Sequence, residues 1–434
     1  MYIYALRDQN SCSNYNGMEN NMATIKPFCA IRPRQDIADR VAALPYDVYN
    51  RKEAKEETLR ENLSFLCIDR AETQMDDSVD TYDASVYQMA NKLFRARIED
   101  NTFVLDNEEC YYIYELTMDG RSQTGIVGCA SIDDYINGVI KKHENTRADK
   151  EIDRINHVDT LSAQTGPIFL AYKARNDINE VIAEVKKTKP LYDFVSNDSI
   201  KHRCWIISDE EDINIIRAAF EDTDAIYIAD GHHRCASAAK VGMKRREQHP
   251  DYTGKEEFNY FLSVLFADEE LMIMDYNRVV KDLNNMSANE IVEKLRNLGT
   301  VEKAQISPYK PSKKGEVGIY LEGEWYRFSF NDEIKSDDPV DGLDVAILQN
   351  NVLEPLFGIK DPKTDNRIDF VGGIRGLKEL ERRVSEDCKI AFAMYPTGID
   401  ELFKVADAGK LMPPKSTWFE PKLRSGLFIH EIEK

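Results

Sequence analysis

Residues 225–241, AIYIADGHHRCASAAKV, set a sharp turn between a run typical of a buried strand and a run typical of a helix. The apolar run ends at Asp230 and Gly231, and helix-forming residues begin at Cys235. A glycine at such a corner lets the backbone approach a ligand, and the free N–H groups of the following helix favour an anion. The segment therefore predicts a strand, turn and helix that cradle a phosphate.

The side chains around this turn suit phosphate chemistry. The planar guanidinium of Arg234 matches phosphate oxygens, and the backbone at Gly231 can bind them too. His232 and His233 can donate hydrogen bonds or transfer protons near neutral pH, which makes both candidate catalytic residues and His233 also a phosphate ligand. Asp230 is a candidate catalytic carboxylate. The alternative is a helix N-cap at Asp230 followed by surface histidines. A zinc site is not expected, because adjacent side chains diverge and no third ligand is near in sequence.

A second cluster lies in the segment KKHENTRADKEIDRINHVD, residues 141–159. Glu144 is a candidate general base, Arg147 could bind a substrate carboxylate, and His143 is a candidate substrate-binding residue. The alternative is a solvated helix crossed by ion pairs, since the charges at Arg147, Lys150, Glu151 and Arg154 recur every three or four residues.

Two further segments carry possible ligands. Lys415, Ser416 and Thr417 could contact phosphate or a metal, although no upstream glycines make this a P-loop. The alternative is an ordered Pro-rich tail that packs Trp418. Asp47, in LPYDVY, either ligates magnesium or caps the next helix.

The composition excludes several classes of protein. A formal net charge of −20 argues against a general nucleic-acid binder, which needs a basic face. No run approaches the roughly 18 apolar residues of a membrane helix, so no membrane partner is expected. The eight scattered cysteines form no C-x-x-C pair, which is typical of reduced thiols in a cytoplasmic protein.

The order of predicted elements favours an α+β fold over a doubly wound sheet, because strands and helices do not alternate strictly. Helices are expected over 36–44, 51–61, 82–99, 176–188 and 211–220. Strands are expected over 110–132, with a hairpin at Asp119 and Gly120.

The chain divides into three predicted parts. Residues 1–22 are expected to be a disordered extension, with Met18 or Met22 closer to the natural start. Residues 23–285 form a core with an insertion over about 50–220, and residues 286–434 form a C-terminal α+β lobe.

Ten ordered motifs, among them ALPYDVYNRKEA, GVIKKHENTRADKEIDR, YIADGHHRCASAA and MPPKSTWFEPKLRSGL, resemble the family known as domain of unknown function 1015, from residue 23 onward. That family is similar to the ParB and sulfiredoxin superfamily, whose signature is a strand, a G-x-x-R turn and a helix that binds nucleotide phosphates. Gly231 and Arg234 occupy the defining positions. Sulfiredoxins have their reactive cysteine where this chain has His232, so sulfinic-acid reduction is not expected.

The resemblance extends to the free-serine kinases of the same superfamily. It implies an enzyme that moves a phosphoryl group between an adenine nucleotide, ADP or ATP, and L-serine or O-phosphoserine, in either direction. Asp47 and Asp230 would then hold Mg²⁺, and Glu144 would handle the hydroxyl proton. The alternatives are a phosphoserine phosphatase and a ParB-like switch that binds CTP or ATP without turnover. The preferred nucleotide and the oligomeric state stay open.

Overall fold

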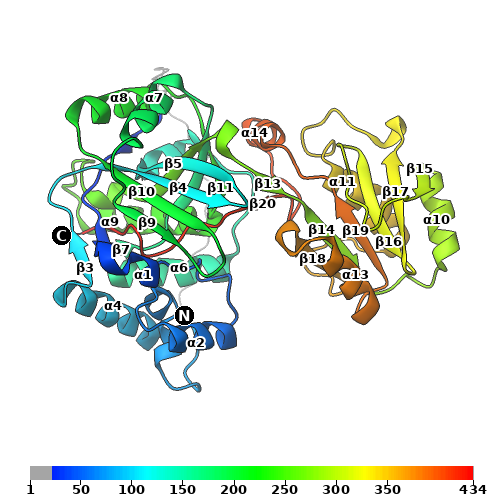
Figure 1. Cartoon of the computed structure of the whole chain (residues 1–434), viewed down its shortest axis with the longest axis horizontal. Helices are drawn as coiled ribbons and strands as arrows, with labels where there is room; N and C mark the ends of the chain where they lie inside the picture. Colours follow the sequence, from blue (N-terminus) through cyan, green and yellow to red (C-terminus); the bar gives the residue numbers. More distant parts are fainter. Residues whose placement is uncertain (1–21, 434) are drawn as a thin grey trace.

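The computed structural model describes residues 22–433, and the chain forms two lobes joined by extended segments (Figure 1). The predicted 1–22 extension lies almost entirely outside the described residues. The mixture of sheets and helices confirms the expected α+β class. No helix among the described residues is long and apolar enough to cross a membrane.

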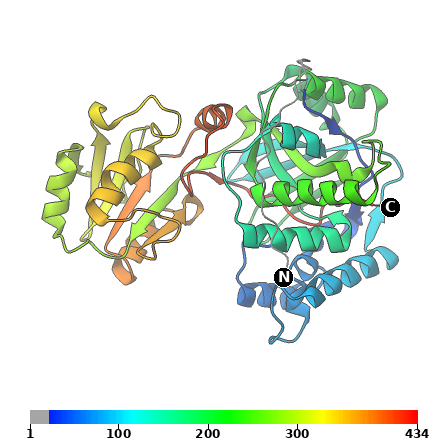
Figure 2. The same ribbon diagram turned by 180° about the vertical axis from the view of Figure 1, so that it is seen from behind.

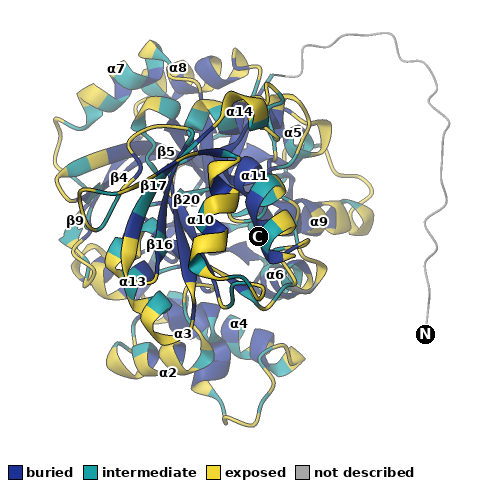
Figure 3. Ribbon diagram, turned by 90° about the vertical axis from the view of Figure 1, so that its right-hand side faces the viewer, coloured by how far each residue is buried: buried dark blue, intermediate teal, exposed yellow. Residues whose placement is uncertain are grey.

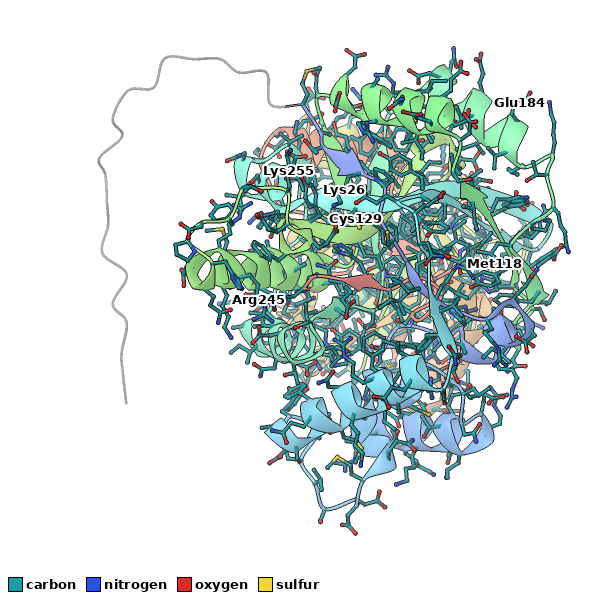
Figure 4. All side chains as sticks on the ribbon, turned by 90° about the vertical axis from the view of Figure 1, so that its left-hand side faces the viewer. Lys26, Met118, Cys129, Glu184, Arg245 and Lys255 are labelled. Carbon is teal, nitrogen blue, oxygen red and sulfur yellow. The ribbon has the colours of Figure 1, made fainter. Side chains whose placement is uncertain are left out.

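The larger lobe is built on a nine-stranded sheet whose order is β6-β11-β8-β12-β5-β4-β10-β9, with β1 paired to β5. Most neighbours are antiparallel, but β8 runs parallel to β12 and β6 parallel to β11. Figure 4 shows Lys26 of β1 beside Cys129 of β5, one of the two residue pairs in this register. The strands are β1 (Ile25–Lys26), β4 (Tyr111–Met118), β5 (Arg121–Ser131), β6 (Ile140–Lys141), β8 (Ile168–Tyr172), β9 (Tyr192–Val195), β10 (Lys201–Ile207), β11 (Ile226–Asp230) and β12 (Tyr260–Ala267).

The hairpin expected at Asp119 and Gly120 is present between β4 and β5, and both residues have positive φ angles of 51° and 80°. These angles match the right-handed twist of the flanking strands. Alternate residues of β5 face opposite sides of the sheet, so that Val127 belongs to one apolar core and Ile126 to another. The sheet is therefore covered on both faces.

Helices cover this sheet in layers. Behind it, α9 lies against α6, and α6 against α4 (Figure 2). Figure 3 shows exposed residues on the outer sides of the helices and buried residues in the strands between them. The helices of this lobe are α1 (Ala38–Val41), α2 (Arg51–Arg60), α3 (Leu66–Asp69), α4 (Ala84–Glu99), α5 (Ile132–Asn137), α6 (Ala148–Leu161), α7 (Asn176–Val185), α8 (Glu210–Glu221) and α9 (His232–Gln248).

The helix predicted over 36–44 is shorter than expected. A 3₁₀ turn at Gln35–Ile37 leads into α1, which ends at Val41. Ala43 instead exchanges two backbone hydrogen bonds with Ser425, of 3.2 and 2.8 Å. Pro45 also disfavours a helical conformation in the residue before it. Tertiary pairing with the C-terminal segment thus replaces the last turn.

The smaller lobe contains a six-stranded antiparallel sheet in the order β15-β17-β16-β19-β14-β18. Helix α13 packs on one face, and the core on the other includes residues of α10 and α11. The elements are β14 (Tyr276–Val280), α10 (Ala288–Arg296), β15 (Gly299–Lys303), β16 (Glu316–Leu321), β17 (Glu324–Phe330), α11 (Asp344–Leu348), α12 (Glu354–Phe357), β18 (Ile368–Gly372), α13 (Leu377–Glu386), β19 (Ile390–Met394) and α14 (Ile399–Asp407).

The C-terminal segment returns to the larger lobe. Strand β20 (Trp418–Phe419) pairs with β13 (Ile273–Met274) between the lobes (Figure 1), and β21 (His430–Glu431) pairs with β7 (Ala163–Gln164). A third two-stranded sheet among the described residues joins β2 (Ile31–Pro33) to β3 (Phe103–Leu105). The domain boundary near residue 285 stays a prediction. The insertion over about 50–220 also stays a prediction, and strands β4, β5, β6, β8, β9 and β10 within it belong to the same sheet as β11.

Candidate functional site

A cleft of about 680 Å³ lies where β11 turns into α9 and where the two lobes meet. Met118, labelled in Figure 4, lies at the end of β4 and lines it. Segments far apart in the sequence converge here. The lining includes Asp47, His143, Glu144, Asp198, Asp230, Tyr276, Ile374, Arg375, Lys415, Ser416, Thr417, Trp418, Glu420 and Lys422.

The turn at the head of α9 requires glycine. Gly231 has a φ of 97°, and a Cβ there would lie 3.0 Å from Nε of Arg234. The helix begins at His232, three residues earlier than the sequence suggested, and Gly231 is its N-cap residue. The alternative with Asp230 as N-cap is therefore wrong, because the one backbone N–H that the Asp230 carboxylate accepts among the described residues is that of its neighbour Gly231, at 3.0 Å, through Oδ1.

The other oxygen of Asp230 accepts a hydrogen bond from Nζ of Lys422, at 3.1 Å. Burial alone would raise the pKa of Asp230, but the charges of Lys422 and Arg234 outweigh it and hold that pKa well below its ordinary value. Asp230 is thus ionised across the physiological range. Nζ of Lys422 also lies 5.1 Å from the centre of the Trp418 ring.

Arg234 does not line the cleft. Its Nη1 donates to the carbonyl of Pro167 at 2.6 Å, and its side chain lines a smaller neighbouring cavity together with Asp69, Arg154 and His157. Pro45 borders both spaces. Phosphate binding by Arg234 stays a prediction.

His232 and His143 form a buried pair with ring centres 4.5 Å apart and perpendicular planes. Burial lowers the pKa of both rings, that of His143 to about 4. Nε2 of His232 accepts the backbone N–H of His143 at 3.4 Å, so Nδ1 carries the proton and faces Oε2 of Glu144 at 4.0 Å. The alternative of surface histidines is wrong for His232, because its ring is packed inside the lobe.

Glu144 lines the cleft beside His143, and its side chain is 44% exposed. Desolvation raises the pKa of Glu144, and the charge of Asp230 adds to the rise, while Lys415 and Lys363 partly oppose it. A carboxylate with a raised pKa accepts a proton more readily than an ordinary one and can return it in the reverse reaction.

Arg147 and His233 lie beside the cleft rather than in its lining. Nε2 of His233 accepts the backbone N–H of Arg147 at 2.9 Å, and Arg147 is the N-cap residue of α6. The solvated-helix alternative for this segment is wrong. Arg154 is buried with its guanidinium 3.7 Å from the ring centre of Tyr46, because α6 is packed between α4 and α9.

The segment of Lys415, Ser416 and Thr417 lines the cleft and also packs Trp418. Lys415 has a φ of 60°, and its Nζ lies 5.5 Å from the ring centre of Tyr276. Trp418 contacts the same tyrosine edge-on at 5.0 Å. The Ser416 hydroxyl donates to the carbonyl of Pro413 at 2.7 Å, so it can only accept a hydrogen bond from a ligand.

Asp47 is exposed on a turn and does not cap the next helix, since Asn50 and Glu53 form the capping box of α2. The described residues hold no cluster of three or more His, Cys, Asp or Glu side chains able to bind a metal. Asp230 pairs with the ammonium of Lys422, and the charges of Asp230, Glu420 and, more weakly, Asp47 raise the pKa of Lys422 against desolvation. The donor set of Asp47 and Asp230 fits Mg²⁺ only in the form in which substrate phosphates complete the coordination.

The sequence did not point to Lys422 or Arg375. The partner of Lys422 lies 192 residues away, so no local spacing could reveal it. A usable signal existed for Arg375, because it lies in a Gly-Gly-Ile-Arg-Gly turn directly after an apolar strand.

The family model described as "Protein of unknown function (DUF1015)" matches residues 25–346, which confirms the resemblance found in the motifs. No curated protein gives a significant match.

Several solved structures are similar to the chain at low identity. A free serine kinase in complex with AMP has 15% identity and a TM-score of 0.34, covering 69% of this chain and 91% of the other. A conserved hypothetical protein from Pyrococcus furiosus has 17% identity and a TM-score of 0.34, covering 70% and 94%. SbnI with a C-terminal truncation, from Staphylococcus aureus, has 11% identity and a TM-score of 0.37, covering 70% and 87%.

Proposed function

The chain belongs to the DUF1015 family, and we propose that it transfers a phosphoryl group between an adenine nucleotide and the hydroxyl of serine, acting on L-serine or O-phosphoserine. One observation carries the proposal. A carboxylate with a raised pKa, Glu144, faces the same cleft as the ionised Asp230 and the ammonium groups of Lys415 and Lys422. The sequence resemblance to free-serine kinases supports the same chemistry.

Phosphoryl transfer depends mainly on positioning and on cations that neutralise the transferred group. Lys415 and Lys422 supply two such cations from the C-terminal segment. Lys422 is fixed by its ion pair with Asp230, so its charge does not have to be reorganised when a phosphate enters. The backbone N–H groups at the start of α9 add positive potential at the same corner.

Glu144 handles the hydroxyl proton. When serine is the acceptor, the ionised carboxylate takes the proton from the attacking hydroxyl. In the opposite direction, the protonated carboxyl returns it to the leaving oxygen. The neutral His232, with its Nδ1 proton facing Glu144, orients this carboxylate.

Magnesium fits as a metal shared with the substrate. Asp47 and Asp230 would hold it, and it would supply charge neutralisation to the phosphate oxygens. Asp230 already pairs with Lys422, so it would both bind the cation and keep the lysine in position, while Asp47 would serve the cation alone.

The nucleotide base has a neighbouring space available. A cavity of about 320 Å³ shares Asp47 with the cleft and is lined in part by Tyr46, Tyr49, Tyr82 and Tyr87. Aromatic side chains suit a purine ring. A nucleotide seated there would direct its phosphates past Asp47 towards the cleft.

The test uses purified protein with Mg²⁺ and O-phosphoserine, with and without ADP, and measures free serine, phosphate and ATP together. ATP and serine formed in equal amounts support the proposal. Serine with inorganic phosphate, independent of ADP, would identify a phosphatase instead. Absence of all products, with retained binding of ATP or CTP, would favour a nucleotide-binding switch.

Two variants locate the reaction. Lys422→Met should lower turnover by roughly 10²-fold, because a fixed charge on the transferred group is removed. The matched change Lys404→Met removes an exposed lysine paired with Asp400 on α14, and should leave turnover unchanged.

A further inference from the structure

The smaller lobe contributes a glycine-rich turn to the cleft. Residues 372–376 connect β18 to α13, and the side chains of Ile374 and Arg375 from this turn line the cleft. Both are exposed, Ile374 to 47%. Lys363, in the same lobe, is near enough for its charge to lower the pKa of Glu144 against the dominant effect of desolvation. A cation of the smaller lobe, Lys363, thus lies within electrostatic range of the Glu144 carboxylate of the larger lobe.

The turn is held in one position. The N–H of Gly373 donates to the carbonyl of Asp275 at 2.7 Å. A Cβ on Gly372 would lie 2.8 Å from the Trp418 ring, and one on Gly373 would lie 2.6 Å from Oδ1 of Asp275. The close approach to these two neighbours requires glycine at both positions. Arg375 is therefore presented from a fixed backbone.

The guanidinium of Arg375 makes no hydrogen bond or ion pair within residues 22–433. Its charge reaches Glu379, but that carboxylate is held by Arg382 one helical turn away. An arginine at a cleft with its planar set of donors unused is suited to bind a carboxylate in a bidentate manner.

We propose that Arg375 binds the α-carboxylate of the amino-acid substrate, so that the substrate bridges the two lobes. This inference rests on the proposed function and assigns its substrate specificity. The phosphoryl group lies with Lys415 and Lys422, on the C-terminal segment, which leaves Arg375 for the other anionic end. Arg147, the carboxylate ligand expected from the sequence, does not line the cleft and instead begins α6.

The test compares O-phosphoserine with O-phosphoethanolamine, which lacks only the carboxylate. Binding of each is measured by calorimetry and turnover by product formation, for the wild-type protein, Arg375→Gln, Arg375→Lys and the control Lys378→Gln on α13. Arg375→Gln should weaken O-phosphoserine binding by roughly 10- to 100-fold and change O-phosphoethanolamine binding less than about twofold. Arg375→Lys should recover only part of the loss, because an ammonium cannot form the paired contact.

The outcomes separate the two claims. Equal weakening of both ligands by Arg375→Gln, or no weakening of either, overturns the carboxylate assignment and leaves the proposed function standing. Failure of the wild-type protein to bind or turn over O-phosphoserine overturns both. An effect of Lys378→Gln as large as that of Arg375→Gln would also overturn the assignment, since it would indicate only a general loss of charge.

Discussion

The ion pair between Asp230 and Lys422 shows how single residues build this site. Asp230 ends a buried strand, and Lys422 belongs to the tail that returns after the smaller lobe. Removing either partner would leave the other charge without compensation in a partly desolvated position. The ion pair therefore holds the C-terminal segment against the end of β11 and, at the same time, keeps the charge of Lys422 in the cleft.

The pH dependence of turnover reports on Glu144. In the direction that phosphorylates serine, Glu144 must be ionised, so activity should fall as the pH drops through its raised pKa. Lys363 lowers that pKa, and Lys363→Gln should therefore move the acidic limb of the pH profile to higher pH. The profile of kcat/KM is the measurement, with Lys360→Gln as the control on the same loop. An acidic limb that moves to lower pH would contradict the assignment of Glu144.

At the scale of elements, the turn from β11 into α9 depends on Gly231. Gly231→Ala should lower the free energy of unfolding by about 1–2 kcal/mol, because a Cβ at this positive φ is strained. It should also lower turnover, since the new Cβ meets the Arg234 side chain and displaces the start of α9. Chemical denaturation and the product assay measure the two effects.

Gly323→Ala is the matched control for that change. Gly323 has a φ of 81° in the hairpin of the smaller lobe, with open space where its Cβ would be. The Gly323→Ala variant should lose about as much free energy of unfolding as Gly231→Ala and should keep the turnover of the wild-type protein. Equal losses of turnover in both variants would show that the Gly231 effect is only a loss of folded protein.

Local sequence patterns predict most of the helices and strands, but not the boundaries that long-range contacts determine. The hairpin at Asp119 and Gly120 was predicted from its turn residues, whose backbone preferences are local. The helix expected over 36–44 stops early because Ala43 pairs with Ser425, nearly four hundred residues later. The sequence predicts the start of α9 three residues too late, since His232 and His233 are poor helix formers that tertiary contacts hold in the first turn.

At the scale of the whole molecule, the cleft gathers cations in a strongly acidic chain. The net charge is −20, yet Lys415, Lys422 and Arg375 all reach one space between the lobes. Such a distribution repels extended polyanions while a small anion can still be bound. Parts of the motifs identified from the sequence line this space, through Asp47, Glu144, Asp230 and Lys415, whereas Arg147 and Arg234 do not. Nothing in the sequence showed that the smaller lobe would supply part of the lining.

The extended segments between the lobes explain why the sequence did not reveal that the smaller lobe lines part of the cleft. Residues 260–280 hold two neighbouring strands of the sequence, yet β12 belongs to the larger sheet and β14 to the smaller. The tail then pairs β20 with β13 across the same junction. Strand periodicity identifies each run, whereas the assignment of neighbouring strands to different sheets depends on long-range pairing.

The most direct test of the central claim is the transfer of the labelled γ-phosphate of ATP to free L-serine, measured as O-phosphoserine. The wild-type protein should form this product, and Glu144→Gln should lower its rate by roughly 10²- to 10⁴-fold with ATP binding retained. The surface change Glu293→Gln, which removes a partner of Arg296 on α10, should have no effect. Full activity of Glu144→Gln, or no product from the wild-type protein, would contradict phosphoryl transfer at this cleft.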